Sequence, residues 1–306
     1  MADKIYNSEV DLTEFPQNLS SMLTQNAEQY SSLPVYQEIK NDEYEPLTWS
    51  QFIKDISSIQ DYLVSTGFKP CDHLAILSEN RQEMLELELA VMAMGGRVVP
   101  IFSGYDPEKA DTLVNFCDAG YVAVADDTQL GKLSLPNKFK KIIHFEEVDE
   151  KTGNLIHFEE LLSSGSDHQL MGSKIDRQEV CLMMYTSGTM GKPKLVQLTH
   201  ENILSQQAAM KLLWNLKNTD RFLSYLPWHH SFGGIYEKYS AICSGAVLSL
   251  DNSYGKDINQ LISNWQKVKP TVFFSVPRIY QALTTLMGQK PEIEKLILHE
   301  ELRFVF

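Results

Sequence analysis

The sequence predicts an α/β fold in which two parallel sheets are flanked by helices. Short apolar runs suited to buried parallel strands alternate with amphipathic helical stretches. The alternation pauses near residue 218 and then restarts, which indicates two α/β units. The length of 306 residues supports this division, because a compact unit has roughly 150 residues.

The first unit begins with helices and continues with alternating strands and helices. Apolar spacing predicts helices over residues 19–30 and 48–67. Strands are then predicted at 73–77, 97–101, 121–125, 141–144 and 179–185, with helices at 82–94 and 106–119 between them.

A glycine-rich segment separates this part of the chain from a second run of alternating elements. A returning strand is predicted at 194–198 and a helix at 201–216. Strands at 221–226, 246–250 and 271–275 and helices at 235–243, 258–268 and from 276 onward follow. Residues 301–306 indicate the start of a buried strand, so we expect a piece of a longer chain.

These patterns predict a division of the chain into three parts. Residues 1–18 are an N-terminal extension. Residues 19–70 together with 219–306 form one α/β subdomain, which is expected to be incomplete at its C-terminal end. Residues 71–218 form a second α/β subdomain that carries the glycine-rich loop.

Composition restricts the partners of the protein. A net charge of −13 argues against nucleic acid or anionic lipid as a main partner. The four cysteines lie far apart, which favours reduced thiols and a cytoplasmic location. The N-terminus does not resemble a secretory signal, and no apolar run reaches the roughly 20 residues that cross a bilayer. Peripheral membrane contact and the oligomeric state stay open.

The glycine-rich loop has the composition of a phosphate-binding site. Glycines let backbone amides approach a polyphosphate, hydroxyls can donate to it or ligate Mg²⁺, and lysines offset its charge. The predicted ATP-binding residues are Thr186, Ser187, Gly188, Thr189, Met190, Gly191, Lys192 and Lys194, with the Thr186 hydroxyl as the candidate metal ligand.

Two other interpretations of this loop are weaker. A Walker A loop needs four residues between its glycines and a Ser or Thr directly after the lysine, and a helix begins immediately after it. Here two residues separate Gly188 from Gly191, Pro193 follows Lys192, and a strand is predicted next. A plain Gly/Ser hairpin explains the glycines but not the two lysines.

Residues 185–194, followed by residues 198–202, resemble the signature of the adenylate-forming superfamily, which includes acyl- and aryl-CoA synthetases, firefly luciferase and peptide-synthetase adenylation domains. Met190 stands where that superfamily usually has Thr or Ser. Four further segments resemble the superfamily in order and spacing from about residue 20 to the end: residues 72–80, 95–108, 226–233 and 270–278. The last has a form common in long-chain fatty acyl-CoA synthetases.

The resemblance implies activation of a fatty or other carboxylic acid by ATP with Mg²⁺, followed by transfer to CoA. It implies His230 and Lys194 as catalytic residues. It also implies a substrate pocket formed by Trp228, His229, His230, Phe232 and Gly233. In this superfamily, further segments bind adenine and ribose and supply a catalytic C-terminal lysine, and the fold also has a barrel subdomain and a C-terminal lid domain. We expect all of these beyond residue 306. Residues 1–306 alone are therefore expected not to catalyse the reaction.

Alternative functions remain open from sequence alone. One is another adenylating enzyme, such as an aryl-CoA ligase, a luciferase-like enzyme or a peptide-synthetase adenylation domain. Another is a non-catalytic nucleotide-binding module, which the Met190 departure favours. Assays across acids of different length would separate the first group from a fatty acid ligase.

Overall fold

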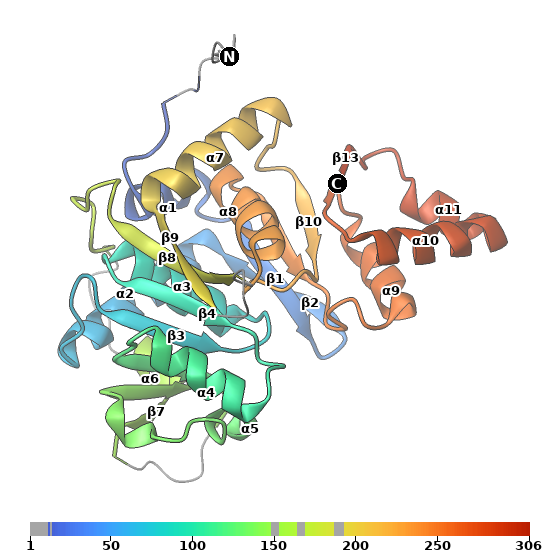
Figure 1. Ribbon diagram of the computed structural model, residues 1–306. Helices are drawn as coiled ribbons and strands as arrows, with labels where there is room; N and C mark the ends of the chain where they lie inside the picture. Colours follow the sequence, from blue (N-terminus) through green and yellow to red (C-terminus); the bar gives the residue numbers. More distant parts are fainter. Residues whose placement is uncertain (1–11, 13, 148–152, 164–168, 187–192) are drawn as a thin grey trace, which may run out of the picture.

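The computed structural model describes residues 12, 14–147, 153–163, 169–186 and 193–306. They form two sheets with helices between and outside them (Figure 1), so the predicted α/β class with two mainly parallel sheets is confirmed. In the described part of the chain, no helix combines the length and apolar character needed to cross a bilayer.

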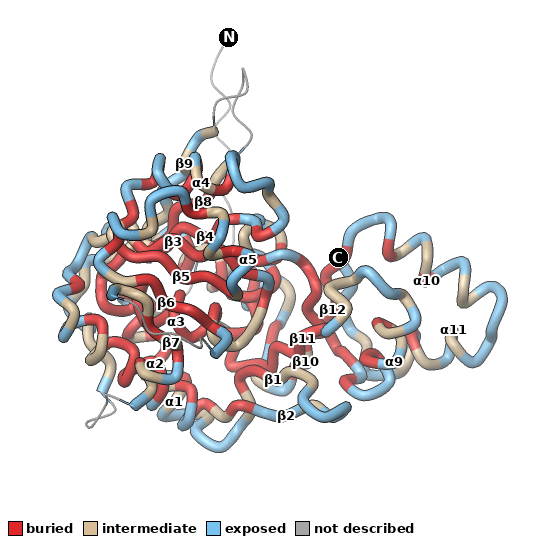
Figure 2. Tube along the Cα trace, turned by 90° about the horizontal axis from the view of Figure 1, so that it is seen from below, coloured by how far each residue is buried: buried red, intermediate tan, exposed pale blue. Residues whose placement is uncertain are grey.

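The larger sheet has seven strands in the order β7-β6-β5-β3-β4-β8-β9, parallel except for the last. They are β3 (His73–Leu77), β4 (Arg97–Ile101), β5 (Tyr121–Val124), β6 (Lys141–His144), β7 (Leu155–His157), β8 (Val180–Thr186) and β9 (Lys194–Thr199). Continuous apolar runs predicted most of these strands, because both faces of the sheet are covered (Figure 2).

The smaller sheet has six strands in the order β13-β12-β10-β11-β1-β2. They are β1 (Pro34–Lys40), β2 (Glu43–Thr48), β10 (Arg221–Ser224), β11 (Val247–Leu250), β12 (Val272–Phe273) and β13 (Phe304–Val305). The hairpin of β1 and β2 was not predicted, although Asn41 and Asp42 both take the positive φ of a tight hairpin turn.

Five helices fill the space between the two sheets and build a shared apolar core. They are α1 (Leu19–Tyr30), α2 (Trp49–Ser65), α3 (Gln82–Ala93), α7 (His200–Leu213) and α8 (Tyr239–Ser244). Helix α3 contacts β1 of one sheet and β4 and β8 of the other, so it joins the two sheets. Its ten buried residues include the carboxyl side chains of Glu86 and Glu88.

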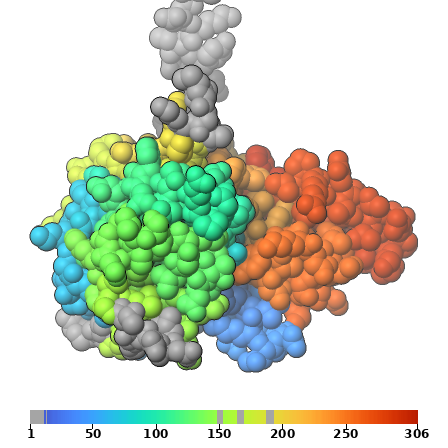
Figure 3. Space-filling view, turned by 60° about the horizontal axis from the view of Figure 1, so that its bottom comes forward, coloured from blue at the N-terminus to red at the C-terminus, as the bar shows by residue number. Residues whose placement is uncertain are grey.

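Most of the remaining described helices lie outside the space between the sheets. Helix α4 (Pro107–Phe116) packs on the outer face of the larger sheet with α5 (Asp127–Leu130) near it. The short α6 (Phe158–Leu162) instead packs against α2 and contributes to the shared core. Helices α9 (Ile258–Val268), α10 (Pro277–Gln289) and α11 (Pro291–Ile297) form a lobe at one side of the molecule (Figure 3).

The last strand differs from the prediction in its burial. Strand β13 pairs with β12 at the edge of the smaller sheet, as the apolar pattern of residues 301–306 predicts for a strand. Val305 and Phe306 are 54% and 53% exposed, and no other described strand pairs with β13 on its far side. The predicted strand is therefore present, whereas its burial, which was expected for a longer chain, stays a prediction.

Candidate functional site

The candidate site is a cavity of about 250 Å³ where the two sheets meet. Its walls are the segments that follow four parallel strands: Ser78–Asn80 after β3, Phe102–Gly104 after β4, Tyr225–His229 after β10, and Tyr254 with Lys256 after β11. Ligands of α/β proteins bind outside the carboxyl ends of the strands, because loops and helix starts converge there. Two sheets contribute such ends to this one cavity.

Asn80 connects the two sheets at the cavity. Its amide nitrogen donates to the backbone oxygen of Leu226 at 2.8 Å, and its amide oxygen accepts from the backbone nitrogen of Trp228 at 2.9 Å. The side chain is buried, so both bonds are sheltered from water. Asn80 thereby fixes residues 226–228, which lead into the predicted histidine pair.

The two predicted site histidines are in different environments. His229 is half-buried in the cavity wall and stacks on Phe102, with ring centroids 4.7 Å apart. Burial, with a smaller effect of neighbouring His230, lowers the pKa of His229 to about 4, so its imidazole is neutral near pH 7. His230 is exposed, and its backbone nitrogen donates to the carbonyl of Pro227. An exposed imidazole at this position can approach an anionic ligand.

A π-helical turn, η2 (Phe232–Lys238), follows the histidines where the sequence predicted a helix only from residue 235. Its start lies very close to the preceding loop. A Cβ on Gly233 would be 2.6 Å from the carbonyl oxygens of Leu226 and Pro227, and one on Gly234 would be 2.2 Å from that of Trp228. Only glycine permits this approach, and π-turns are frequent at functional sites.

The other predicted pocket residues are placed in different ways. Trp228 is buried in the core, its indole nitrogen donates to the Ser224 hydroxyl, and its ring lies 6.4 Å from that of Tyr36. Phe232 is half-buried, with ring centroids 5.9 Å from both Phe274 and Phe306. Of this set, His229, His230 and Phe232 offer side-chain surface, whereas Trp228 and Gly233 support the local structure.

A buried polar network lies beneath the histidine segment. The Ser224 hydroxyl donates to Glu237 at 2.5 Å, and burial raises the pKa of that carboxyl well above its usual value. Lys238 lies 2.5 Å from Glu88 of α3, and both side chains are buried. Burial lowers the pKa of Lys238, an effect that the Glu88 carboxylate opposes. The two inward residues of η2 therefore attach the turn to both β10 and α3.

Only the two ends of the predicted phosphate loop belong to the described residues. Thr186 ends β8 and Lys194 begins β9, and the two residues are paired across the antiparallel strands. Both are exposed at the same edge of the larger sheet at which β3 and β4 end. Six predicted ligands lie outside the described residues: Ser187, Gly188, Thr189, Met190, Gly191 and Lys192. Because Lys194 begins strand β9, no helix starts directly after Lys194, which agrees with the exclusion of a Walker A loop.

Several cavity residues could not be identified from the sequence. Ser103 donates to Glu79 at 2.8 Å, which ties the turn after β4 to the turn after β3. Tyr254 has a positive φ in the loop after β11, and this turn places Lys256 in the wall. The Asn-Ser-Tyr-Gly composition of residues 252–255 indicates a turn, but not its position beside residues that precede it by about 150 positions.

Comparisons with known proteins agree with this architecture. The family profile described as AMP-binding enzyme matches residues 23–306. Long-chain-fatty-acid–CoA ligase ACSBG2 of Mus musculus is 26% identical over 289 residues, which are 88% of this chain and 43% of that protein. This chain therefore spans less than half the length of that relative.

Two solved structures show the same fold. A long-chain-fatty-acid–CoA ligase, FadD1 of Archaeoglobus fulgidus, matches with a TM-score of 0.80 at 18% identity, over 93% of this chain and 57% of that one. The fatty acyl-adenylate ligase of L. pneumophila, solved with acyl adenylate and pyrophosphate, matches with a TM-score of 0.72 at 21% identity, over 88% and 46% of the two chains.

Proposed function

Because the chain belongs to the family of AMP-binding enzymes, we propose that it is the N-terminal part of a long-chain fatty acid–CoA ligase. Such an enzyme activates a carboxylic acid with ATP as acyl-AMP and then transfers the acyl group to CoA. The observation that carries this proposal is the cavity at the meeting point of the two sheets, whose wall contains His229, the neighbour of His230. The cavity lies after the carboxyl ends of β3 and β4, at the same edge of the larger sheet where β8 ends at Thr186 and β9 begins at Lys194.

The first step of this reaction joins two anions, so the site must offset their repulsion. We assign this role to Lys194 and to the loop between Thr186 and Lys194, which would hold the phosphates of ATP. His230 would donate a hydrogen bond to an oxygen of the acid or of the α-phosphate as charge develops there. His229 and Phe232 would bound the space that the acid enters.

Magnesium is the metal that this chemistry implies. Thr186 is exposed, and its hydroxyl is a hard oxygen donor that suits Mg²⁺, which commonly takes its other ligands from phosphate and water. When bound with ATP, the ion neutralises phosphate charge. A cytoplasmic location is also part of the proposal, and it rests on the dispersed cysteines of the sequence.

Fatty-acid-dependent exchange of pyrophosphate into ATP by the full-length protein tests the function. We expect exchange with long-chain acids, and a loss of roughly a hundredfold or more in His230→Ala and Lys194→Met. Lys174→Met is the matched control, because Lys174 is also an exposed lysine but precedes the start of β8, whereas the loop follows the end of that strand. An inactive wild type with every acid would contradict the proposal, and exchange only with aryl or amino acids would reassign the substrate.

Residues 1–306 alone provide the second test. We expect this chain to show no exchange, since the segments that contact adenine and ribose in this superfamily are expected beyond residue 306. Exchange above background by purified residues 1–306 would show instead that the two sheets contain a complete adenylation site. Equal inactivity of the full-length protein would favour a non-catalytic nucleotide-binding module.

A further inference from the structure

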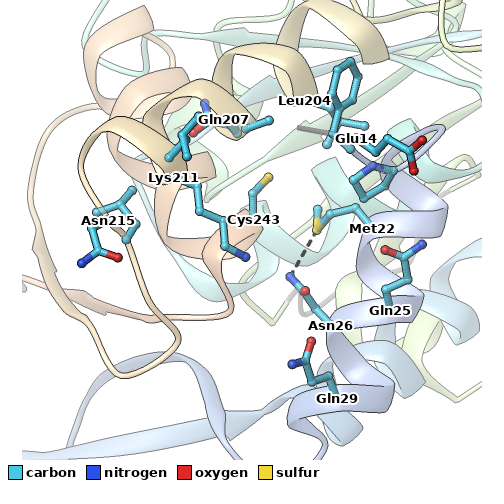
Figure 4. A pocket seen from close by; sticks show the side chains of 15 residues that line it. Glu14, Met22, Gln25, Asn26, Gln29, Leu204, Gln207, Lys211, Asn215 and Cys243 are labelled. Carbon is cyan, nitrogen blue, oxygen red and sulfur yellow. Dashed lines mark hydrogen bonds between the residues drawn. The ribbon is translucent and has the colours of Figure 1, made fainter. Parts of the chain in front are cut away.

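A second cavity, of about 500 Å³, lies between α1, α7 and α8 and is separate from the cleft at the strand ends. None of its described lining residues belongs to the candidate functional site. Its volume is within the range of pockets that hold small organic ligands. Figure 4 shows side chains of α1 and α7 facing each other across it.

The walls of this cavity combine an apolar surface with polar groups. The apolar surface comes from Phe15 and Ala208, which are half-buried, and from Leu212, which is 43% exposed. The lining also includes the buried Met22. Two of its amides are already engaged: Asn26 donates to the carbonyl of Ile242, and Gln207 donates to that of Ile235. These bonds connect the cavity wall to α8 and η2, the segment that follows the site histidines.

Lys211 supplies the positive charge of the cavity. It lies on α7, and its side chain extends toward Asn26 of α1 (Figure 4). Among the described residues it has no ion-pair partner, although the protein carries a net charge of −13. Lys211 is close enough to Cys243 to favour the thiolate slightly, yet burial dominates and raises the pKa of that thiol to about 12. The thiol is therefore a neutral part of the wall.

The charges of the lining restrict the class of ligand. Lys211 is the single cation of the lining within the described ranges, and the carboxylate of Glu14 lies at another point of the same lining without pairing with it. A polyphosphate would meet one cation and one anion, so its net attraction would be small. A molecule with one negative charge and an apolar body matches both the lysine and the apolar wall.

We propose that this cavity binds an amphipathic monocarboxylate, with its carboxylate at Lys211 and its apolar chain along Phe15, Ala208 and Leu212, close to the buried Met22. The site is distinct from the strand-end cleft in which the proposed reaction takes place. Binding therefore does not depend on the proposed activity and can be measured on residues 1–306.

Methyl NMR of the chain labelled with ¹³C-methyl methionine, titrated with sodium decanoate, tests the proposal. Met22 reports on this cavity. Met184 reports instead on the π-turn that follows the site histidines, since its methyl carbon lies 3.6 Å from a Cβ built on Gly234. Met22→Leu and Met184→Leu assign the two signals. We expect a saturable shift of Met22, and roughly tenfold weaker binding in Lys211→Gln, because a charge-assisted bond is lost.

Three controls distinguish specific binding at Lys211 from a general affinity for detergent-like molecules. Lys217→Gln, an exposed lysine outside the cavity, should bind decanoate like the wild type. Decanol should bind at least about tenfold more weakly, and decyl phosphate no better than decanoate. The proposal is wrong if only Met184 shifts, if Lys211→Gln binds like the wild type, if decanol binds as tightly, or if decyl phosphate binds more tightly.

Discussion

At the scale of single residues, His200 couples the fold to pH. Its ring is fully buried at the start of α7, and Nδ1 accepts from the backbone nitrogen of Leu19 at 3.2 Å. Burial lowers its pKa from 6.5 to about 4. At pH values between these two, the unfolded state binds a proton that the folded state does not. The contribution of His200 to the free energy of unfolding is therefore fully present above the higher value and decreases as the pH falls through this window. When the pH is lowered from 7 to about 5, the free energy of unfolding measured with urea should fall by about 2 kcal/mol more in the wild type than in His200→Gln. His230→Gln, at an exposed site, should keep the wild-type slope, and an unchanged slope in His200→Gln would contradict this role of His200.

At the scale of elements, the π-turn η2 depends on the absence of a side chain at Gly234. An added Cβ would be 2.2 Å from the carbonyl oxygen of Trp228, which is backbone and cannot move independently. Gly234→Ala should therefore lower the free energy of unfolding by about 2 kcal/mol or more. Gly288 of α10 is the matched control, because nothing lies within 4 Å of a Cβ there, and Gly288→Ala should be neutral or stabilise by up to about 1 kcal/mol. Thermal and urea unfolding measure both, and similar values for the two variants would refute the role of close packing.

At the scale of the whole molecule, the ion pair of Glu88 and Lys238 joins the two halves of the core. Helix α3 and η2 approach from different subdomains of the predicted division, and both charges are buried. Lys238→Met should cost about 3–5 kcal/mol, because it leaves a carboxylate buried without its cation. The double variant Glu88→Gln, Lys238→Met removes both charges and should recover most of that loss. A double variant as unstable as the single one would show that the pair is not the cause.

The sequence predicted elements where burial imposes a simple pattern. Strands such as β3 and β4 are apolar and buried after their first residue because helices cover both faces, and their predicted bounds are those of the structure. Strand β1 mixes Gln37 and Glu38 with apolar residues, so its pattern resembles a polar loop. The π-turn was missed because Gly233 and Gly234 usually indicate a break, whereas here they permit close packing.

The site was partly predictable for a similar reason. The segment from residue 226 to 233 carries its two histidines as neighbours in sequence, so a local pattern is enough to find them. Tyr254 and Lys256 reach the same cavity only because β10 and β11 are adjacent in the smaller sheet. Their position at the cavity depends on the order of the strands in the sheet, and no local pattern in a single sequence indicates that order.

The place of the N-terminal hairpin has a consequence for synthesis on the ribosome. Strand β1 pairs with β11, so residues 34–40 meet their parallel neighbour only after about 200 further residues have been translated. The larger sheet contains only residues 73–199, and all of its strands emerge before β10. Nascent chains should therefore gain protease protection in the larger sheet first, while the hairpin stays cleavable until β11 leaves the exit tunnel.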